Sequence, residues 1–353
     1  MDTPDNIDFQ EDDQEWFEHF RFEVDHGQSL LRIDKFLMAR IMNASRNKIQ
    51  AAANSGFILV NNEPVKPSYK VKPEDVITVM MTHPLREIEL IPEDIPLEIL
   101  FEDRDLIVIN KPAGMVVHPA YGNYDGTVVN ALLGHFRKNN LKSNVNTIGP
   151  LLVHRIDKDT SGIMLIAKTE EAQTLLGKQF FHHTIKRKYE AIVWGDIKED
   201  SGTINGHIGR SAKNRKVFTV FPEGDHGKHA ITHYKVIERL GYVTLIECEL
   251  ETGRTHQIRV HLKYIGHPLF NDETYGGDKI LKGTTFTKYK QFVSNCFKIC
   301  PRQALHAKSL GFIHPANGSA VYFESGLPPD MTELVAKWKH YAAHKSMDDS
   351  VNA

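Results

Sequence analysis

The N-terminal part of the chain alternates between apolar spacings typical of strands and of helices. Residues 20–24 alternate apolar and charged side chains, which predicts a half-buried strand. Residues 31–41 place Ile33, Phe36, Leu37 and Ile41 on one face, which predicts a helix. Ser45 is suited to cap a second helix over residues 46–53, and further strands are predicted over residues 57–60 and 76–80. We therefore expect a small first domain over residues 20–81.

The rest of the chain is dominated by apolar runs of strand length. Strands are predicted over residues 106–110, 162–167 and 188–194, and helices over residues 128–136 and 170–181, the first capped by Thr127. Irregular mixing of many strands with few helices predicts an α+β domain on a large mixed, mainly antiparallel sheet. We place it at residues 97–341, after a proline-punctuated linker at residues 82–96 and before a polar tail at residues 342–353.

Charge is distributed unevenly along the chain. The 353 residues carry a net charge of −2, but residues 1–25 hold ten Asp or Glu against one Arg, a net −9. The remainder is therefore at +7, which is compatible with a polyanionic partner. Residues 1–19 are acidic and poor in aliphatic side chains, so we expect a disordered tail there.

Several classes of protein are disfavoured by composition. The three cysteines form no CxxC pair, and no helical metal-ligand pair or glycine-rich nucleotide loop is present, so we expect no metal and no cofactor. The sequence has no long apolar run and no signal pattern at its start, which predicts no membrane contact and a cytoplasmic location.

The first domain resembles the S4 RNA-binding domain. The resemblance is carried by residues 32–37, by Ser45-Arg46 and by residues 56–61, in the order that the family shows. It implies RNA as a partner and places four residues near the RNA-facing surface: Lys35, Arg46, Lys48 and Asn61.

The densest polar segment is His154-Arg155-Ile156-Asp157-Lys158-Asp159-Thr160-Ser161-Gly162, in a loop before a buried strand. Arg155 and Lys158 flank its two carboxylates, and nearby cations favour an ionised, nucleophilic acid. Asp159 precedes Thr-Ser-Gly, where a turn hydrogen bond is its natural local role. Composition by itself leaves the choice between Asp157 and Asp159 open, and an isolated run of this kind is more often a surface turn.

This segment resembles the His-Arg-Leu-Asp-x-x-Thr-Ser-Gly motif of the RluA-type pseudouridine synthase family, with Ile156 in place of Leu. Further segments match the family in order across residues 97–335: residues 110–119, 186–191, 252–262 and 302–307. Together with an S4 domain, the resemblance points to the branch that acts on large-subunit ribosomal RNA.

The resemblance implies roles for individual residues. Asp157 is the essential carboxylate, acting either by attack on the sugar or by removal of a ribose proton, and Arg259 pairs with it. Tyr189 stacks on a flipped uracil, while Ile156 and Leu262 pack at the active site. Arg155 contacts the target backbone or fills the gap left by the base, and the candidate phosphate contacts are Lys111, Lys158, Arg187, Lys188 and Arg254. We interpret His154, His256 and His261 as structural.

The residues around Arg259 agree with this role. Thr255 is suited to cap a helix over residues 256–265 that ends at Gly266, with Ile258, Leu262 and Ile265 facing the core. Arg259 then lies at the edge of the buried face, where a guanidinium needs a partner.

Three other functions compete with this interpretation. A non-catalytic ribosome-assembly factor predicts a degraded Asp157 motif, whereas the motif is intact. A glycoside hydrolase or nucleosidase needs a second carboxylate, and Asp159 is a poor candidate. The same chemistry on tRNA or on another ribosomal site stays open. The preferred hypothesis is a monomeric enzyme acting on ribosomal RNA in the large-subunit precursor.

Overall fold

The computed structural model of the protein describes residues 17–41, 45–81, 90–119, 122–139, 150–212, 214 and 217–351. The chain divides into two compact units, residues 1–88 and 89–353. Most of the predicted acidic tail and residues 82–89 of the predicted linker lie outside the described residues. The first strand already begins at Phe17, so the last three residues assigned to the tail are ordered in a sheet.

The first unit packs two short helices on a small antiparallel sheet. Its four-stranded sheet has the order β1-β6-β3-β4, built from β1 (Phe17–Glu23), β6 (Val76–Met81), β3 (Ile58–Val60) and β4 (Glu63–Pro64). A second ladder pairs β2 (Leu31–Arg32) with β5 (Lys70–Val71). The helices are α1 (Ile33–Met38) and α2 (Arg46–Asn54), and their apolar faces share one core with the sheet.

The sequence located the two helices and the three longer strands, but not the two-residue strands β2, β4 and β5. The predicted second helix is confirmed, and the Ser45 hydroxyl accepts a hydrogen bond from the Lys48 backbone N–H as its cap. The first helix is shorter than predicted, because Leu31 and Arg32 pair in β2 with β5 and leave the helix to start at Ile33. Ile41 lies beyond the end of α1 but still packs against the core.

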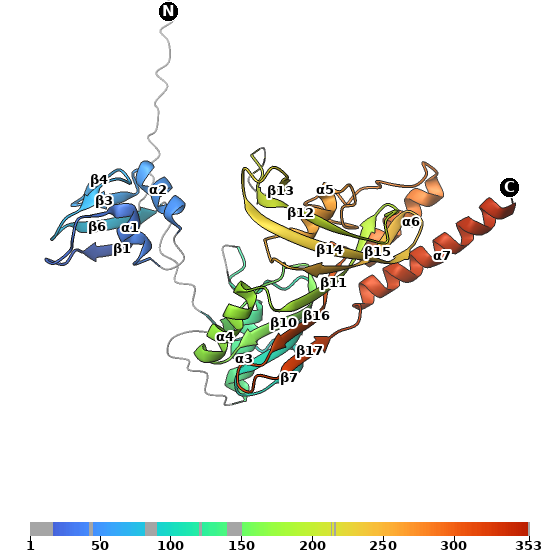
Figure 1. Cartoon of the computed structure of the whole chain (residues 1–353), viewed down its shortest axis with the longest axis horizontal. Helices are drawn as coiled ribbons and strands as arrows, with labels where there is room; N and C mark the ends of the chain where they lie inside the picture. Colours follow the sequence, from blue (N-terminus) through green and yellow to red (C-terminus); the bar gives the residue numbers. More distant parts are fainter. Residues whose placement is uncertain are drawn as a thin grey trace, which may run out of the picture. The chain divides into compact units, whose positions relative to one another are not determined.

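The second unit is built on an eleven-stranded sheet (Figure 1). Its main order is β13-β12-β14-β15-β11-β16-β10-β8-β7, with β17 beside β16 and β9 beside β10. The strands are β7 (Glu98–Glu102), β8 (Leu106–Lys111), β9 (Leu151–Leu152), β10 (Ser161–Ala167), β11 (Lys186–Trp194), β12 (Ser201–Arg210), β13 (Phe218–Phe221), β14 (Lys228–Arg239), β15 (Val243–Leu250), β16 (Leu305–Ile313) and β17 (Ala320–Glu324). Among the described strands only β10 and β16 pair in parallel, so the predicted mixed, mainly antiparallel sheet is confirmed.

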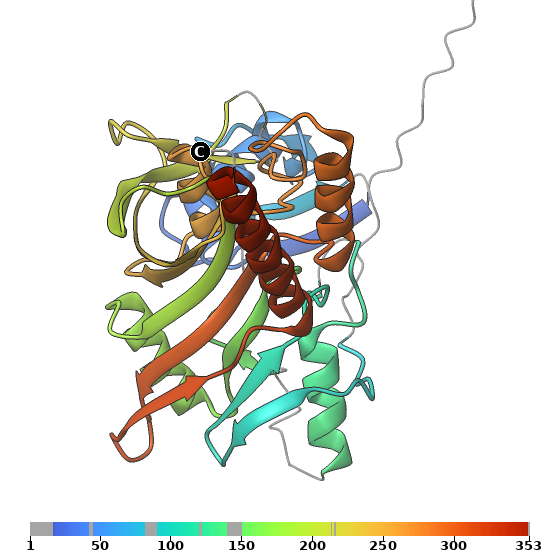
Figure 2. The same ribbon diagram turned by 90° about the vertical axis from the view of Figure 1, so that its right-hand side faces the viewer.

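Helices cover both faces of this sheet, which explains its continuous apolar runs. In β8, Leu106 and Val108 pack in the core shared with α4 (Glu170–Phe181), and Ile107 and Ile109 pack under α3 (Val128–Lys138). Figure 2 shows α3 at one end of the sheet and α6 (Thr287–Ile299) with α7 (Pro329–Val351) at the other. The predicted polar tail is therefore helical as far as Val351.

The face that carries the site is set by strand alternation in β11. Ile192 and Trp194 point into the core under α6 and α7. Tyr189, Ala191 and Val193 point to the opposite face, into a core shared with α5 (Gln257–Tyr264). Because side chains two apart share a face, β11 brings Tyr189 to the face where α5 packs.

Candidate active site

The loop of residues 153–160 lies between β9 and β10, and distant segments fix its backbone. The Lys111 ammonium donates to the Lys158 carbonyl at 2.9 Å. Arg302 Nη1 donates to the Asp159 carbonyl at 2.9 Å. Three segments that the sequence analysis singled out separately therefore meet at one loop and hold its shape.

Lys111 does not have the RNA-facing side chain that the sequence predicted. Its side chain is fully buried, and Nζ donates to the carbonyls of Pro112, Met115 and Lys158 at 2.7, 2.8 and 2.9 Å. Burial lowers the pKa of Lys111 to about 7. The prediction of a phosphate contact is wrong here, because backbone carbonyls already take its donors.

Arg259 reaches the loop from α5 and joins two carboxylates. Its Nη1 donates to Oδ2 of Asp157 at 3.0 Å, while Nε and Nη2 donate to the two oxygens of Asp272 at 2.8 and 2.9 Å. Burial opposes the charge on Arg259, but the hydrogen bonds to Asp272 and the charge of Asp157 raise its pKa overall. The Asp272 side chain is fully buried, whereas that of Asp157 is 21% exposed, so only Asp157 faces the cavity.

Sequence reasoning missed Asp272. It expected one acid for Arg259, but a guanidinium has five N–H donors, and one carboxylate cannot satisfy them when the side chain is buried. That donor count was the available signal, although nothing in the sequence placed Asp272 against α5.

His256 approaches the other oxygen of Asp157. Its Nε2 lies 3.9 Å from Oδ1 of Asp157, and its Nδ1 shares a hydrogen bond of 2.9 Å with the Tyr275 hydroxyl. Burial lowers the pKa of His256, and the charge of Asp157 partly offsets this. His256 is the N-cap of α5 in a left-handed conformation with φ 56°, without a side-chain cap, so the prediction of Thr255 as cap is wrong. Such strained residues cluster at functional sites.

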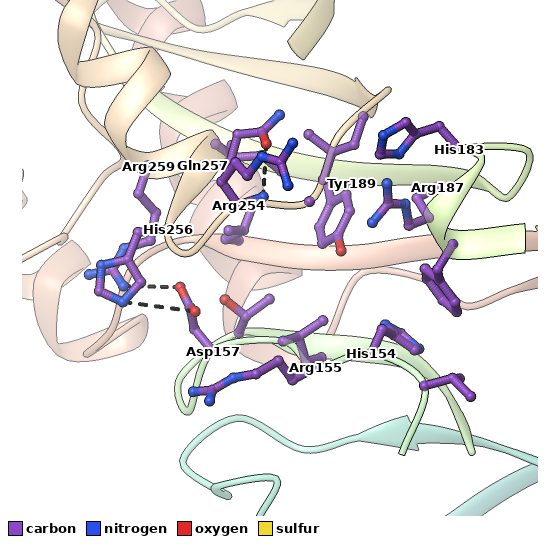
Figure 3. Close-up of a pocket in the computed structure, with 18 of the residues that line it drawn as sticks. His154, Arg155, Asp157, His183, Arg187, Tyr189, Arg254, His256, Gln257 and Arg259 are labelled. Atoms are coloured by element: carbon purple, nitrogen blue, oxygen red, sulfur yellow. Dashed lines mark hydrogen bonds and ion pairs between the residues drawn. The ribbon is translucent and has the colours of Figure 1, made fainter. Parts of the chain in front are cut away.

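These residues open onto a cavity of about 550 Å³ (Figure 3). Tyr189 lines it, with its side chain otherwise buried beside Ile156 and Leu262 in one core. Burial raises the pKa of Tyr189, which keeps its hydroxyl protonated at neutral pH. Asp157 is the only carboxylate among the described residues that line the cavity. The size of the cavity suits one nucleoside, since ligand pockets are roughly 300–1,000 Å³.

The other predicted RNA contacts of this unit fall into two groups. Arg155, Arg187 and Arg254 line the cavity. Lys158 is exposed near it on the same loop, whereas Lys188 is outside the cavity lining and pairs with Glu247 at 2.7 Å.

In the first unit, two of the four predicted RNA contacts make hydrogen bonds within the protein. Arg46 donates to the fully buried Asp34 at 3.0 Å, and the hydrogen bonds to this carboxylate outweigh burial and lower its pKa. Asn61 sits at a turn with φ 51°, and its side chain bonds to Asp75 and to the Val76 N–H. The other two, Lys35 and Lys48, are exposed.

A search of the described residues finds no group of His, Cys, Asp or Glu arranged to hold a metal ion. Cys248, Cys296 and Cys300 are buried free thiols, and burial raises the pKa of each. In the described part of the chain, none of the helices combines the length and apolarity that a membrane span requires.

The chain is similar to known proteins over both of its units. A family model for RNA pseudouridylate synthase matches residues 105–264, and the S4 domain model matches residues 31–77. The chain is 48% identical to an uncharacterized RNA pseudouridine synthase of Chlorobaculum parvum, over 89% of this chain and 96% of that protein. It is 44% identical to the ribosomal large subunit pseudouridine synthase D of Zymomonas mobilis, over 86% and 92% of the two chains.

The solved structure of human RNA pseudouridylate synthase domain containing 1 aligns with a TM-score of 0.51 at 25% identity, over 72% of this chain and 90% of that one. The chain therefore belongs to the RNA pseudouridylate synthase family. It is an RNA pseudouridine synthase, an isomerase with an N-terminal S4 domain, as the sequence motifs predicted.

Proposed function

We propose that this enzyme isomerises uridines of large-subunit ribosomal RNA, free or within the precursor particle, and that Asp157 is its nucleophile. The relatives from Zymomonas mobilis and Neisseria meningitidis, 44% and 41% identical, are both named as ribosomal large-subunit enzymes. The observation that carries the role of Asp157 is its position as the one carboxylate of the cavity lining in the described chain, held by Arg259 beside Tyr189.

The target uridine has to leave its stack to enter a cavity of this kind. Flipping costs about a few kcal/mol, and less for a single-stranded base. Tyr189 supports this step, because its ring faces the same cavity and stacking on an aromatic side chain is worth ~1–3 kcal/mol per base. The ribose then lies toward Asp157 and the uracil toward Tyr189.

Two chemical routes use the Asp157 carboxylate. In the first, an oxygen of Asp157 bonds to C1′ of the ribose as the bond from C1′ to N1 of uracil breaks. In the second, Asp157 removes the 2′ proton as the same bond breaks, which leaves a glycal. In both, the uracil turns, C5 bonds to C1′, and the C5 proton is lost while N1 gains one. In the first route the bond from Asp157 to C1′ breaks as the C5 bond forms, and in the second Asp157 returns its proton to C2′. The reaction needs no oxidant and no co-substrate.

The cations around the cavity supply the contacts to the RNA backbone in this proposal. Arg155 is exposed at the cavity, on the same loop as Asp157, and Arg254 lines it. In the S4 domain, Lys35 and Lys48 are exposed, and Arg46 remains partly exposed beside Asp34. Contacts of this type position the RNA without reading its sequence.

The test is pseudouridine mapping of ribosomal RNA and tRNA from four strains: native, gene deleted, Asp157→Ala, and Asp94→Ala as a control. Asp94 is an exposed aspartate of the same unit that pairs with Lys138 on the surface. Loss of the same large-subunit pseudouridines in the deletion and Asp157→Ala strains, with full modification in the control, supports both parts of the proposal.

Two other outcomes would each reject one part of the proposal. Sites lost from tRNA instead of ribosomal RNA keep the chemistry and reject the substrate. Sites that disappear on deletion but persist with Asp157→Ala reject Asp157 as the nucleophile.

A further inference from the structure

Arg187 carries a buried positive charge that has no anionic partner among the described residues. The residue is 7% exposed, and its Nε is buried without a hydrogen-bond partner. Its guanidinium lies 5.6 Å from the ring centroid of Phe180, and no ion pair to it is found among the described residues. Burial lowers the pKa of Arg187. Buried charges are normally paired, so this side chain lacks a ligand that the folded chain does not supply.

A second guanidinium and one imidazole lie at the same part of the cavity. Arg254 and His183 also line it, and the charges of Arg187 and Arg254 add to burial in lowering the pKa of His183. Figure 3 shows His183 next to Arg187, on the side of Tyr189 away from Asp157. Glu251 is the carboxylate that acts on His183, but it is half exposed and pairs with His233 at 2.7 Å. This end of the cavity therefore has surplus positive charge.

The backbone leaves room for the Arg187 guanidinium. A Cβ atom on Gly253 would lie 2.6 Å from Nη1 of Arg187, so a larger residue at 253 would require the guanidinium to shift. On β11, Arg187 and Tyr189 are two positions apart and both face the cavity. The cation and the stacking ring are thus presented to one bound nucleotide.

We propose that Arg187, together with Arg254, forms a subsite for one phosphodiester phosphate beside the target uridine. This inference rests on the proposed function and adds where the backbone of the flipped nucleotide is held. A guanidinium presents several N–H donors and a full charge, which suits an anionic phosphate better than a neutral uracil carbonyl. Asp157 lies at one end of the cavity and Arg187 at the other, with no second carboxylate in the described lining, so a bound nucleotide is contacted at both ends.

The test is equilibrium binding of an RNA fragment of the large-subunit RNA, carrying a uridine whose modification Asp157→Ala abolishes, to the full-length chain. All proteins carry Asp157→Ala, which prevents turnover, and binding is measured at several salt concentrations. Arg187→Gln is expected to weaken binding about tenfold. It should also reduce the slope of log K against log salt by about 0.7, the value for one phosphate contact on a single strand.

Lys186→Gln is the matched control, because it removes the same charge from the preceding residue of β11, which is exposed and outside the cavity lining. It is expected to leave both affinity and slope unchanged. Arg187→Lys keeps a point charge and should retain most of the slope, which separates loss of the contact from loss of the fold.

Weaker binding with an unchanged slope in Arg187→Gln overturns the proposal, because it means that Arg187 reads an uncharged group such as a uracil carbonyl. Unchanged affinity overturns it as well and leaves Arg187 a structural residue. Failure of the proposed function is distinct from both, since it appears in the mapping as the absence of any pseudouridine that depends on Asp157.

Discussion

Arg259 is bound to Asp272 by two hydrogen bonds, of 2.8 and 2.9 Å, and this pairing determines which of its nitrogens remains for Asp157. With Nε and Nη2 engaged, Nη1 is left to hold Asp157. The side chain of Arg259 cannot rotate without breaking both bonds to Asp272. The buried acid therefore positions the exposed one through the guanidinium between them.

Replacing Asp272 should slow the chemical step without weakening RNA binding. Asp272→Asn keeps the shape of the side chain but loses the charged pair of hydrogen bonds with Arg259. A misplaced catalytic group costs on the order of 100-fold in rate. The measurement is single-turnover pseudouridine formation at saturating enzyme, with RNA affinity and Tm measured alongside. Arg259→Lys cannot form this pair of hydrogen bonds, so adding Asp272→Asn to it should reduce the rate little further. Fully additive losses would show that Asp272 supports the fold and not Arg259.

Two substitutions of Tyr189 should separate its stacking on the base from a role in proton transfer. Tyr189→Phe retains the ring and is expected to keep RNA affinity, whereas Tyr189→Ala should lose about 1–3 kcal/mol of it. Burial keeps the hydroxyl protonated, so any loss of turnover in Tyr189→Phe at full affinity measures its role as a proton donor. Equal affinity of the Phe and Ala variants would contradict stacking at this position.

Gly162, in β10 just after the loop that carries Asp157, should be irreplaceable. It has φ +118°, and a Cβ there would collide with the backbone of Ala307 in the neighbouring β16. Gly162→Ala is expected to destabilise the protein by roughly 2 kcal/mol or more, since strained backbone and overpacking combine. Gly177→Ala in α4 has open space and should stabilise by ~0.5–1 kcal/mol. Denaturant unfolding of both variants compares them, and equal stability would contradict the steric explanation.

His154 should make the protein sensitive to acid. Its Nε2 accepts a hydrogen bond from the Leu165 N–H at 2.9 Å, so the folded state requires an unprotonated nitrogen there. Burial lowers the pKa of His154 from 6.5 to about 3. Between these values the unfolded chain binds a proton that the folded chain does not, so stability falls as the pH falls from 6.5 towards 3.

The contribution of this one histidine is at most ~1.4 kcal/mol per pH unit. The free energy of unfolding, measured from pH 7 to pH 4, should therefore depend less steeply on pH in His154→Gln than in the native protein. The same steepness in both would assign the acid sensitivity to other buried histidines such as His306.

The sequence by itself determined the local elements and the chemistry. Apolar spacing located α2, α4 and the strand that contains Tyr189, because an amphipathic pattern and a cap are properties of neighbouring residues. The ordered motifs around Asp157 identified the family, which the relatives confirm. Through that resemblance the sequence predicted that Asp157 and Arg259 pair, and in the structure Arg259 donates a hydrogen bond to Asp157.

Only the tertiary structure decided which polar residues are buried and what they contact. Lys111 and Arg187 look alike in the sequence as cations of segments that resemble the family. In the structure, backbone carbonyls take the donors of Lys111, whereas Arg187 is buried facing the cavity without an anionic partner among the described residues. The fork from Asp272 and the left-handed His256 depend on how the segment after α5 folds back on it. These contacts join residues far apart in the chain or set by loop geometry, and no local pattern of apolar and polar positions encodes them.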